Sequence, residues 1–294
     1  MNIPILSINV DYPKVGLLRP VSDGERAAYE RDGAAIVPGI IPEEWIIFMR
    51  DAVTRLVDRA DPSAQNYADE GDPQFFSLTF PWMFDDAFKA WATRGPLIDV
   101  ARQVMAGANM ITFFYDQIFA KAPGATKRTP WHQDLPFLPI SGDQVVRIWV
   151  PFDRVTAGSG AIHYLRGSHR WGVIYHPVGF KNVPMITDTY ANSPYQDLPD
   201  FEAEYGSHEW LVAEANPGDL LLHHPRTVHG SLGNMTGDHR RAVASFYAGD
   251  QVAWNPHPAN MFNNKSLTGH VAAPDLKPGA ALELSLIHIS EPTR

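Results

Sequence analysis

Two side chains that bind metal ions readily, His132 and Asp134, stand two residues apart in the segment Thr-Pro-Trp-His-Gln-Asp-Leu-Pro, residues 129–136. In an extended strand, side chains two residues apart leave the same face, so this imidazole and this carboxylate could converge on one point. These donors suit a borderline divalent metal, and two histidines with one carboxylate leave open positions on iron(II). A lone His-x-Asp also occurs by chance, as a surface histidine beside a solvated aspartate. A metal site therefore requires a second histidine from elsewhere in the chain.

The choice of that second histidine lies among His223, His224, His229 and His239. His223 and His224 end an apolar run, so they could line a cavity. His229 instead begins the triplet His-Gly-Ser and stands eleven residues before Arg240.

Several motifs follow one another along the chain: His-x-Asp at 132–134, an apolar strand at 145–153, Gly-Ser-His at 167–169, Pro-Gly-Asp at 217–219, His-Gly-Ser at 229–231 and an arginine at 240. This order resembles the phytanoyl-CoA dioxygenase family of iron(II)- and 2-oxoglutarate-dependent oxygenases. The resemblance is strong from about Gln117 to Tyr247 and looser over the N-terminal part. It implies a mainly β protein with some α structure, in which N-terminal helices pack on a double-stranded β-helix (a jelly-roll, cupin-like core).

The resemblance also implies a metal-binding role for three matching positions. His132, Asp134 and His229 correspond to the iron ligands of the family, because His229 alone combines the His-Gly-Ser triplet with the arginine eleven residues later. His169, in the Gly-Ser-His turn, is expected to be structural, with its ring hydrogen-bonded to a loop.

A second set of matching positions is implied to bind 2-oxoglutarate. Arg240 corresponds to the arginine that pairs with the distal carboxylate of this co-substrate, Ser231 assists it, and Thr129 is assigned to the same site. A guanidinium suits the task because it binds a carboxylate through two parallel, charge-assisted hydrogen bonds. Arg241 is the competing arginine, but a two-residue alternation would send it to the opposite face.

The implied reaction uses iron(II), 2-oxoglutarate and O2, and it hydroxylates a small organic substrate with succinate and CO2 as co-products. Related halogenases replace the carboxylate ligand by a small residue, so the presence of Asp134 favours hydroxylation. One alternative is a cupin-type metal enzyme that does not use 2-oxoglutarate, which would have no use for Arg240 and Ser231. The other is a non-catalytic jelly-roll binding protein, against which the complete triad argues. The primary substrate is not identified, because acyl-CoA substrates belong to only one branch of the family.

Composition limits the partners. The chain of 294 residues has 33 acidic and 24 basic residues and a net charge of −9, so nucleic acid and anionic membrane surfaces are not expected partners, although a local basic pocket for an anionic substrate is possible. Without cysteine, a metal site must use His, Asp or Glu. No basic-then-apolar leader or membrane-length apolar run is present, so we expect a cytoplasmic protein with a small-molecule substrate. The oligomeric state is left open.

The coarse organisation follows from local signals. We expect a single oxygenase domain over residues 1–284, with a helical part at about 20–106 and the jelly-roll core at about 110–250. Ser22 and Glu25 form a capping-box pattern before a short helix, and Pro42 opens a longer one. Residues 61–71 are expected to form a polar loop, and 81–106 two short helices broken near Gly95. The 25 prolines and 22 glycines suit a turn-rich β protein.

Three residues are candidates for the substrate side of the site. Residues 111–121 read as a strand that places Gln117 and Lys121 on one face, where they either line a polar cavity or lie at a sheet edge. Trp149, in the strand at 145–153, either flanks the metal pocket or is an ordinary core tryptophan.

Two further segments stand outside the regular pattern. Residues 171–210 have little periodicity and many aromatic side chains, which predicts a lid or substrate loop over the metal. Residues 285–294 resemble translated adapter sequence, so we expect a non-native tail that adds no strand and no ligand.

Overall fold

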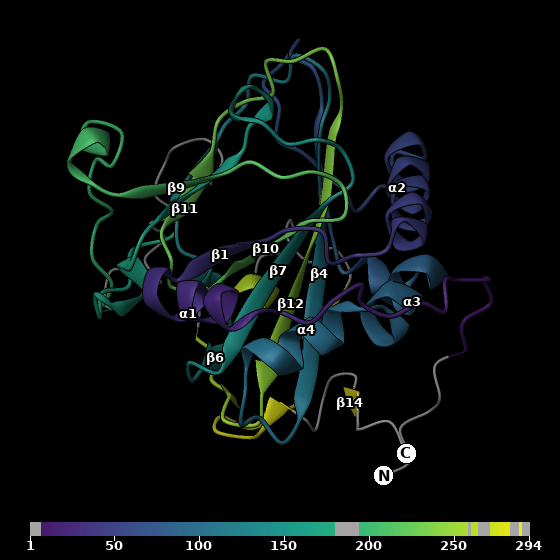
Figure 1. Cartoon of the computed structure of the whole chain (residues 1–294). Helices are drawn as coiled ribbons and strands as arrows, with labels where there is room; N and C mark the ends of the chain where they lie inside the picture. Colours follow the sequence, from purple (N-terminus) through teal and green to yellow (C-terminus); the bar gives the residue numbers. More distant parts are fainter. Residues whose placement is uncertain (1–6, 180–193, 258–259, 264–270, 283–287, 290–294) are drawn as a thin grey trace.

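The computed structural model describes residues 7–179, 194–257, 260–263, 271–282 and 288–289 of the chain. N-terminal helices pack on an antiparallel β core, which confirms the expected fold class (Figure 1). The α-helices are α1 (Asp23–Asp32), α2 (Glu43–Asp58), α3 (Asp86–Arg94) and α4 (Leu97–Val104). Short 3₁₀ helices span Pro81–Met83, Leu135–Phe137, Ala157–Ser159, Ser168–Arg170, Tyr205–Ser207 and Met261–Asn263.

The β core consists of two main sheets. In the described part of the chain the larger sheet runs β1 (Ala34–Val37), β10 (Leu220–His223), β7 (Val145–Pro151), β12 (Arg240–Gly249), β4 (Ile111–Lys121), β3 (Phe75–Thr79) and β2 (Gln65–Asn66). The smaller sheet runs β5 (Thr129–His132), β11 (His229–Ser231), β8 (Ile162–Leu165) and β9 (Trp210–Ala213). A two-stranded pair joins β13 (Ala253–Trp254) to β6 (Ile140–Ser141).

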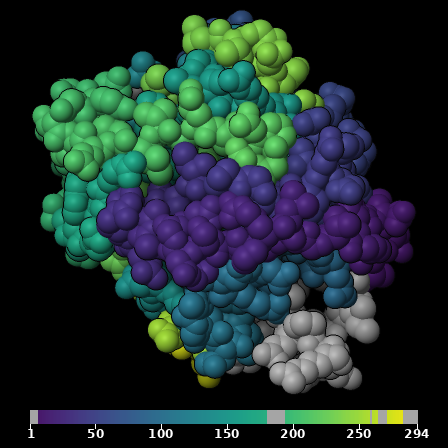
Figure 2. Space-filling model, viewed as in Figure 1, coloured from purple at the N-terminus to yellow at the C-terminus, as the bar shows by residue number. Residues whose placement is uncertain are grey.

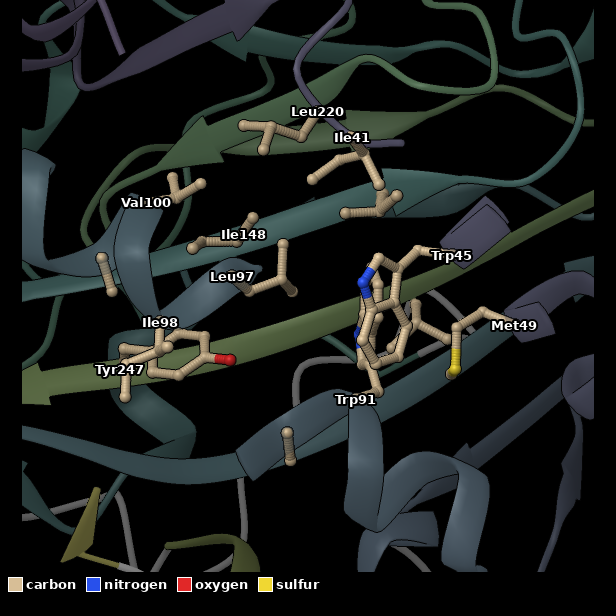
Figure 3. Close-up of a cluster of buried hydrophobic side chains, with 14 of the residues drawn as sticks. Ile41, Trp45, Met49, Trp91, Leu97, Ile98, Val100, Ile148, Leu220 and Tyr247 are labelled. Carbon is tan, nitrogen blue, oxygen red and sulfur yellow. The ribbon is translucent and has the colours of Figure 1, made fainter. Parts of the chain in front are cut away.

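The helices cover the face of the larger sheet that turns away from the smaller one (Figure 1). Figure 3 shows part of the resulting core, a buried cluster that includes Trp45 of α2, Trp91 of α3, and Ile148 and Leu220 of the sheet. The ring centroids of these two indoles are 5.6 Å apart. Burial of these apolar side chains stabilises the packing of the helices on the larger sheet, whose other face forms one wall of the site.

Local signals in the sequence place most of the N-terminal elements. The Ser22 side chain accepts a hydrogen bond from the backbone of Glu25 while Glu25 caps in return, so the expected capping box is present. After α1, Gly33 adopts φ 75°, and a Cβ there would lie 2.3 Å from His169 Nδ1 and 2.4 Å from Thr227 Oγ1. Only glycine fits this turn, which brings α1 and β1 against the strands of the core. Figure 2 shows the N-terminal segment, in purple, crossing one face of the molecule.

Two sequence predictions need correction. The expected polar loop at 61–71 contains β2, because Gln65 and Asn66 pair with Ser77 and Phe76 of β3. The tail was expected to add no strand, yet β14 (His288–Ile289) pairs with β4. The remainder of residues 285–294 lies outside the described residues. Among the helices that the structure describes, none combines the length and apolar character needed to cross a membrane.

Candidate metal and co-substrate site

Three potential metal ligands come together between the two sheets. His132 ends β5 and His229 begins β11, and the two residues are paired across the antiparallel strands. Asp134 Oδ1 lies 3.5 Å from His132 Nε2 and 3.9 Å from His229 Nε2. The three ligand atoms lie within 4.8 Å of one another, a spacing that one metal ion could bridge.

The local geometry differs in one detail from the sequence prediction. The strand ends at His132, and Asp134 has helical dihedral angles (φ −76°, ψ −33°) at the start of the Leu135–Phe137 turn. The imidazole and carboxylate therefore converge through a tight turn and not through strand alternation.

Backbone carbonyls fix which nitrogen of each histidine is available. His132 Nδ1 lies 2.8 Å from the carbonyl oxygen of Pro130, and His229 Nδ1 lies 2.9 Å from that of Thr227. A carbonyl only accepts hydrogen bonds, so each Nδ1 carries the hydrogen and each Nε2 keeps a lone pair. This arrangement is typical of metal-binding histidines. Burial lowers the pKa of His229 well below its usual value, which also favours the neutral ligand form. The donor set therefore fits iron(II).

The other candidate histidines are not placed as ligands. His223 Nε2 lies 3.1 Å from Asp134 Oδ2, and its Nδ1 lies 3.2 Å from the Tyr164 hydroxyl. Because the carboxylate accepts, Nε2 must carry the hydrogen, so it has no lone pair for a metal. His224 Nδ1 accepts from the backbone of Arg226.

A buried arginine that the sequence analysis did not assign lies beside the triad. Arg147 Nη1 is 3.1 Å from Asp134 Oδ2, and the same guanidinium donates to the Tyr115 hydroxyl at 2.6 Å and to Gln117 Oε1 at 2.9 Å. Burial alone would raise the pKa of Asp134, but the Arg147 guanidinium beside the carboxylate outweighs burial and holds this pKa well below its usual range. The sequence did contain a signal for this role, because Arg147 is a charged residue inside the otherwise apolar strand at 145–153.

Arg240 lines the same cavity as the three donors and is a buried cation that the described part of the chain does not neutralise. Its side chain is 2 % exposed, and its Nη2 donates to the carbonyl of Gly160 at 2.7 Å. Its Nε has no acceptor, and no described carboxylate forms an ion pair with it. Burial lowers its pKa to about 10. The guanidinium lies 5.2 Å from the ring centroid of Trp149. A buried guanidinium of this kind is stabilised when an anionic ligand binds to it.

Two hydroxyl side chains that line the same cavity, those of Ser231 and Thr129, are hydrogen-bonded to each other. Ser231 Oγ donates to Thr129 Oγ1 at 3.1 Å, and it accepts from Lys121 Nζ, also at 3.1 Å. Lys121 donates in addition to the carbonyl of Leu232. Arg240, Ser231 and Thr129 all line the cavity.

Arg241 takes no part in this site. Its Nε and Nη2 donate to the two carboxylate oxygens of Asp153 at 2.8 and 2.7 Å, and its Nη1 donates to Thr54 of α2. Neighbouring residues of β12 thus point to opposite faces of the sheet, as the alternation predicted.

The cavity has a volume of about 290 Å³ and contains all three potential metal ligands. Gln117 and Trp149 line it, as expected. Lys121 does not, because its amine lies behind Ser231. Within the predicted lid segment, Val178 and Gly179 line the cavity, whereas residues 180–193 fall outside the described part of the chain.

A family model described as phytanoyl-CoA dioxygenase (PhyH) matches residues 29–242. The chain belongs to the phytanoyl-CoA dioxygenase family. As a member it is an iron(II)- and 2-oxoglutarate-dependent dioxygenase, and the His-Asp-His group and the buried arginine suit these two cofactors.

Relatives agree with this family assignment, and a solved structure shares the fold. A probable phytanoyl-CoA dioxygenase of Caenorhabditis elegans is 22 % identical over 260 residues, covering 83 % of this chain and 80 % of the relative. Human peroxisomal phytanoyl-CoA dioxygenase is 27 % identical over 150 residues, covering 50 % of this chain but only 41 % of the human enzyme. The epimerase SnoN from nogalamycin biosynthesis, solved with Fe3+, alpha ketoglutarate and nogalamycin RO, has the same fold, with a TM-score of 0.67, 21 % identity and coverage of 88 % and 94 %.

Proposed function

We propose that this dioxygenase hydroxylates a small organic molecule, with iron(II) held by His132, Asp134 and His229. The distal carboxylate of 2-oxoglutarate would pair with Arg240, with Ser231 and Thr129 beside it. One observation carries the proposal: a buried arginine that has no carboxylate partner among the described residues lines the same cavity as three converging metal donors.

When bound, iron(II) with 2-oxoglutarate and O2 supplies the oxidising power, converting the co-substrate to succinate and CO2 while one oxygen atom goes to the substrate. The chain supplies orientation and exclusion of water. Its two histidines present Nε2 lone pairs because backbone carbonyls fix their tautomers. The presence of the Asp134 carboxylate favours hydroxylation over halogenation.

The cavity lining indicates the kind of substrate. Its remaining walls are mainly aromatic and aliphatic with neutral polar groups, formed by Gln65, Tyr67, Thr79, Tyr115, Gln117, Phe119, Phe137, Ile162, Val178 and Met261. Among the described lining residues, the two arginines already have roles: Arg147 pairs with Asp134, and Arg240 is assigned to the co-substrate. The lining therefore favours a mostly apolar, uncharged substrate over the phosphate groups of a coenzyme A thioester.

Substrate-dependent succinate formation tests this proposal. Purified protein with iron(II), ascorbate and 2-oxoglutarate should release succinate with members of a panel of neutral, mainly apolar metabolites, and less with acyl-CoA thioesters. The Asp134→Ala variant serves as the inactive control. A cupin-type enzyme that does not use 2-oxoglutarate would turn over substrate without succinate, and a binding module would give no turnover; either result would overturn the proposal.

A further inference from the structure

Two buried residues on neighbouring strands converge on the same oxygen of Asp134. His223 of β10 and Arg147 of β7 are direct cross-strand partners in the larger sheet. His223 Nε2 and Arg147 Nη1 each lie 3.1 Å from Asp134 Oδ2. The other carboxylate oxygen, Oδ1, faces His132 and His229.

We propose that His223 and Arg147 act as a carboxylate clamp, a pair of positioning residues that occupies Oδ2 and leaves only Oδ1 of Asp134 for the metal. This inference rests on the proposed metal site. These two contacts on Oδ2 oppose rotation of the carboxylate into a bidentate position, because such a rotation would break a hydrogen bond and an ion pair in a buried site. The ligand is thus held in a one-oxygen geometry before the metal arrives.

Each member of the carboxylate clamp is itself held in place. The Tyr164 hydroxyl lies 3.2 Å from His223 Nδ1, where it can donate to the ring while Nε2 donates to Asp134. The Tyr115 hydroxyl and Gln117 Oε1 accept from the Arg147 guanidinium. His223 and Arg147 are 2 % and 5 % exposed, so water has little access to compete for these bonds.

The same contacts give Gln117 a second role. It lines the cavity, as expected for a substrate-side residue, and it also positions Arg147. The carboxylate clamp therefore connects the proposed metal ligand to the wall that a substrate would touch.

The two members differ in how they affect a metal ion. Arg147 fixes the carboxylate, but its positive charge also repels a nearby dication. His223 donates to the same oxygen, and its replacement by leucine or glutamine leaves the Arg147 cation in place, so it tests the orientation of Asp134 more directly. Variants of His223 consequently give the cleaner test.

The experiment is a titration of the metal-free full chain with Mn(II), followed by calorimetry, on the wild type, His223→Leu and His223→Gln. The leucine removes the donor, so we expect Mn(II) affinity to fall about tenfold or more, the usual effect of losing an outer hydrogen-bond partner of a ligand. The glutamine offers an amide donor and should restore affinity to within about threefold of the wild type. The visible spectrum of the Co(II)-loaded protein should change in the leucine variant and return in the glutamine variant.

Two controls make the outcomes decisive. Circular dichroism and thermal unfolding report whether each variant is folded, and Tyr164→Phe removes only the hydroxyl that orients His223. We expect Tyr164→Phe to weaken Mn(II) binding by a smaller factor, about threefold. If folded His223→Leu binds Mn(II) as tightly as the wild type and has an unchanged Co(II) spectrum, the carboxylate clamp is overturned and the proposed metal site is not. If His223→Leu does not fold, an unchanged Mn(II) affinity in Tyr164→Phe overturns the carboxylate clamp. A folded wild type that binds no Mn(II) would overturn both proposals.

Discussion

His132 and His229 are direct partners in the β5–β11 pair, with ring centroids 4.2 Å apart. Two residues that are far apart in sequence thus reach one point because two short strands are in register. The separation of these strands depends on Gly230, which follows His229. A Cβ at Gly230 would lie 2.8 Å from Trp131 Cε3 and 2.9 Å from the carbonyl oxygen of Thr129.

We therefore expect Gly230→Ala to push β11 away from β5. The Thr129 carbonyl is part of the backbone and cannot move aside as a side chain could, so the clash must shift the strand. The free energy of unfolding should therefore fall by about 1–3 kcal/mol. Mn(II) affinity should fall at the same time. Chemical denaturation and metal titration check both effects, and Gly206→Ala, where nothing lies within 4 Å of the added carbon, is the matched control.

Removal of the buried cation at the co-substrate end should act on 2-oxoglutarate and not on metal. Arg240→Met is expected to weaken 2-oxoglutarate binding to the Mn(II)-loaded protein about 100-fold, which corresponds to about 3 kcal/mol for a lost charge-assisted pair. Arg241→Met removes a guanidinium from the opposite face and should leave this affinity unchanged, while losing its contacts to Asp153 and Thr54. Equal losses in the two variants would show that the effect is not local.

A buried acid on the helix side of the larger sheet should lower stability at neutral pH. Asp116 is fully buried, and burial raises its pKa well above the usual value. The native state therefore keeps a proton that the unfolded chain releases, so this contribution is present below about pH 4 and is lost as the pH rises. Asp116→Asn keeps an oxygen for the backbone N–H of Trp82 and should raise the melting temperature at pH 8 more than at pH 4.5. The same shift at both pH values would contradict this account.

His224 should make the protein sensitive to acid. Burial, followed by the neighbouring His169, lowers the pKa of His224 to about 4, compared with an ordinary value near 6.5. The unfolded chain binds this proton first, so stability is fully present above about pH 6.5 and is lost as the pH falls towards 4, by about 3 kcal/mol at most. In His224→Asn, whose side chain can still accept from the backbone of Arg226, the decline between these pH values should be shallower. Thermal unfolding across pH 4–7 measures the difference, and parallel curves would refute it.

The sequence predicts local structure well where one signal dominates. The strand predicted at 111–121 is β4, and alternation correctly separates Arg240 from Arg241. Alternation gives the direction of a side chain but not what lies in front of it. Lys121 shares a strand face with Gln117, yet Ser231 separates its amine from the cavity.

The contacts that hold the proposed ligands are harder to predict. His223 and Arg147 act on Asp134 through a pairing of strands that are more than seventy residues apart in sequence, and no local pattern encodes that register. The distinction between His223 and His229 also depends on which ring nitrogen must carry the hydrogen, because Nε2 of His223 meets the Asp134 carboxylate and Nδ1 of His229 meets a backbone carbonyl. The family resemblance selected His229, and the structure places its Nε2 3.9 Å from Asp134 Oδ1.

The central claim, that His132, Asp134 and His229 hold the iron beside 2-oxoglutarate, is tested most directly by the visible charge-transfer band of the anaerobic complex. We expect the wild type, titrated with iron(II) and then 2-oxoglutarate without O2, to develop this band, and His224→Asn to retain it. His229→Ala and Asp134→Ala should lose it. Absence of the band in the folded wild type, or an undiminished band in His229→Ala, would contradict the account.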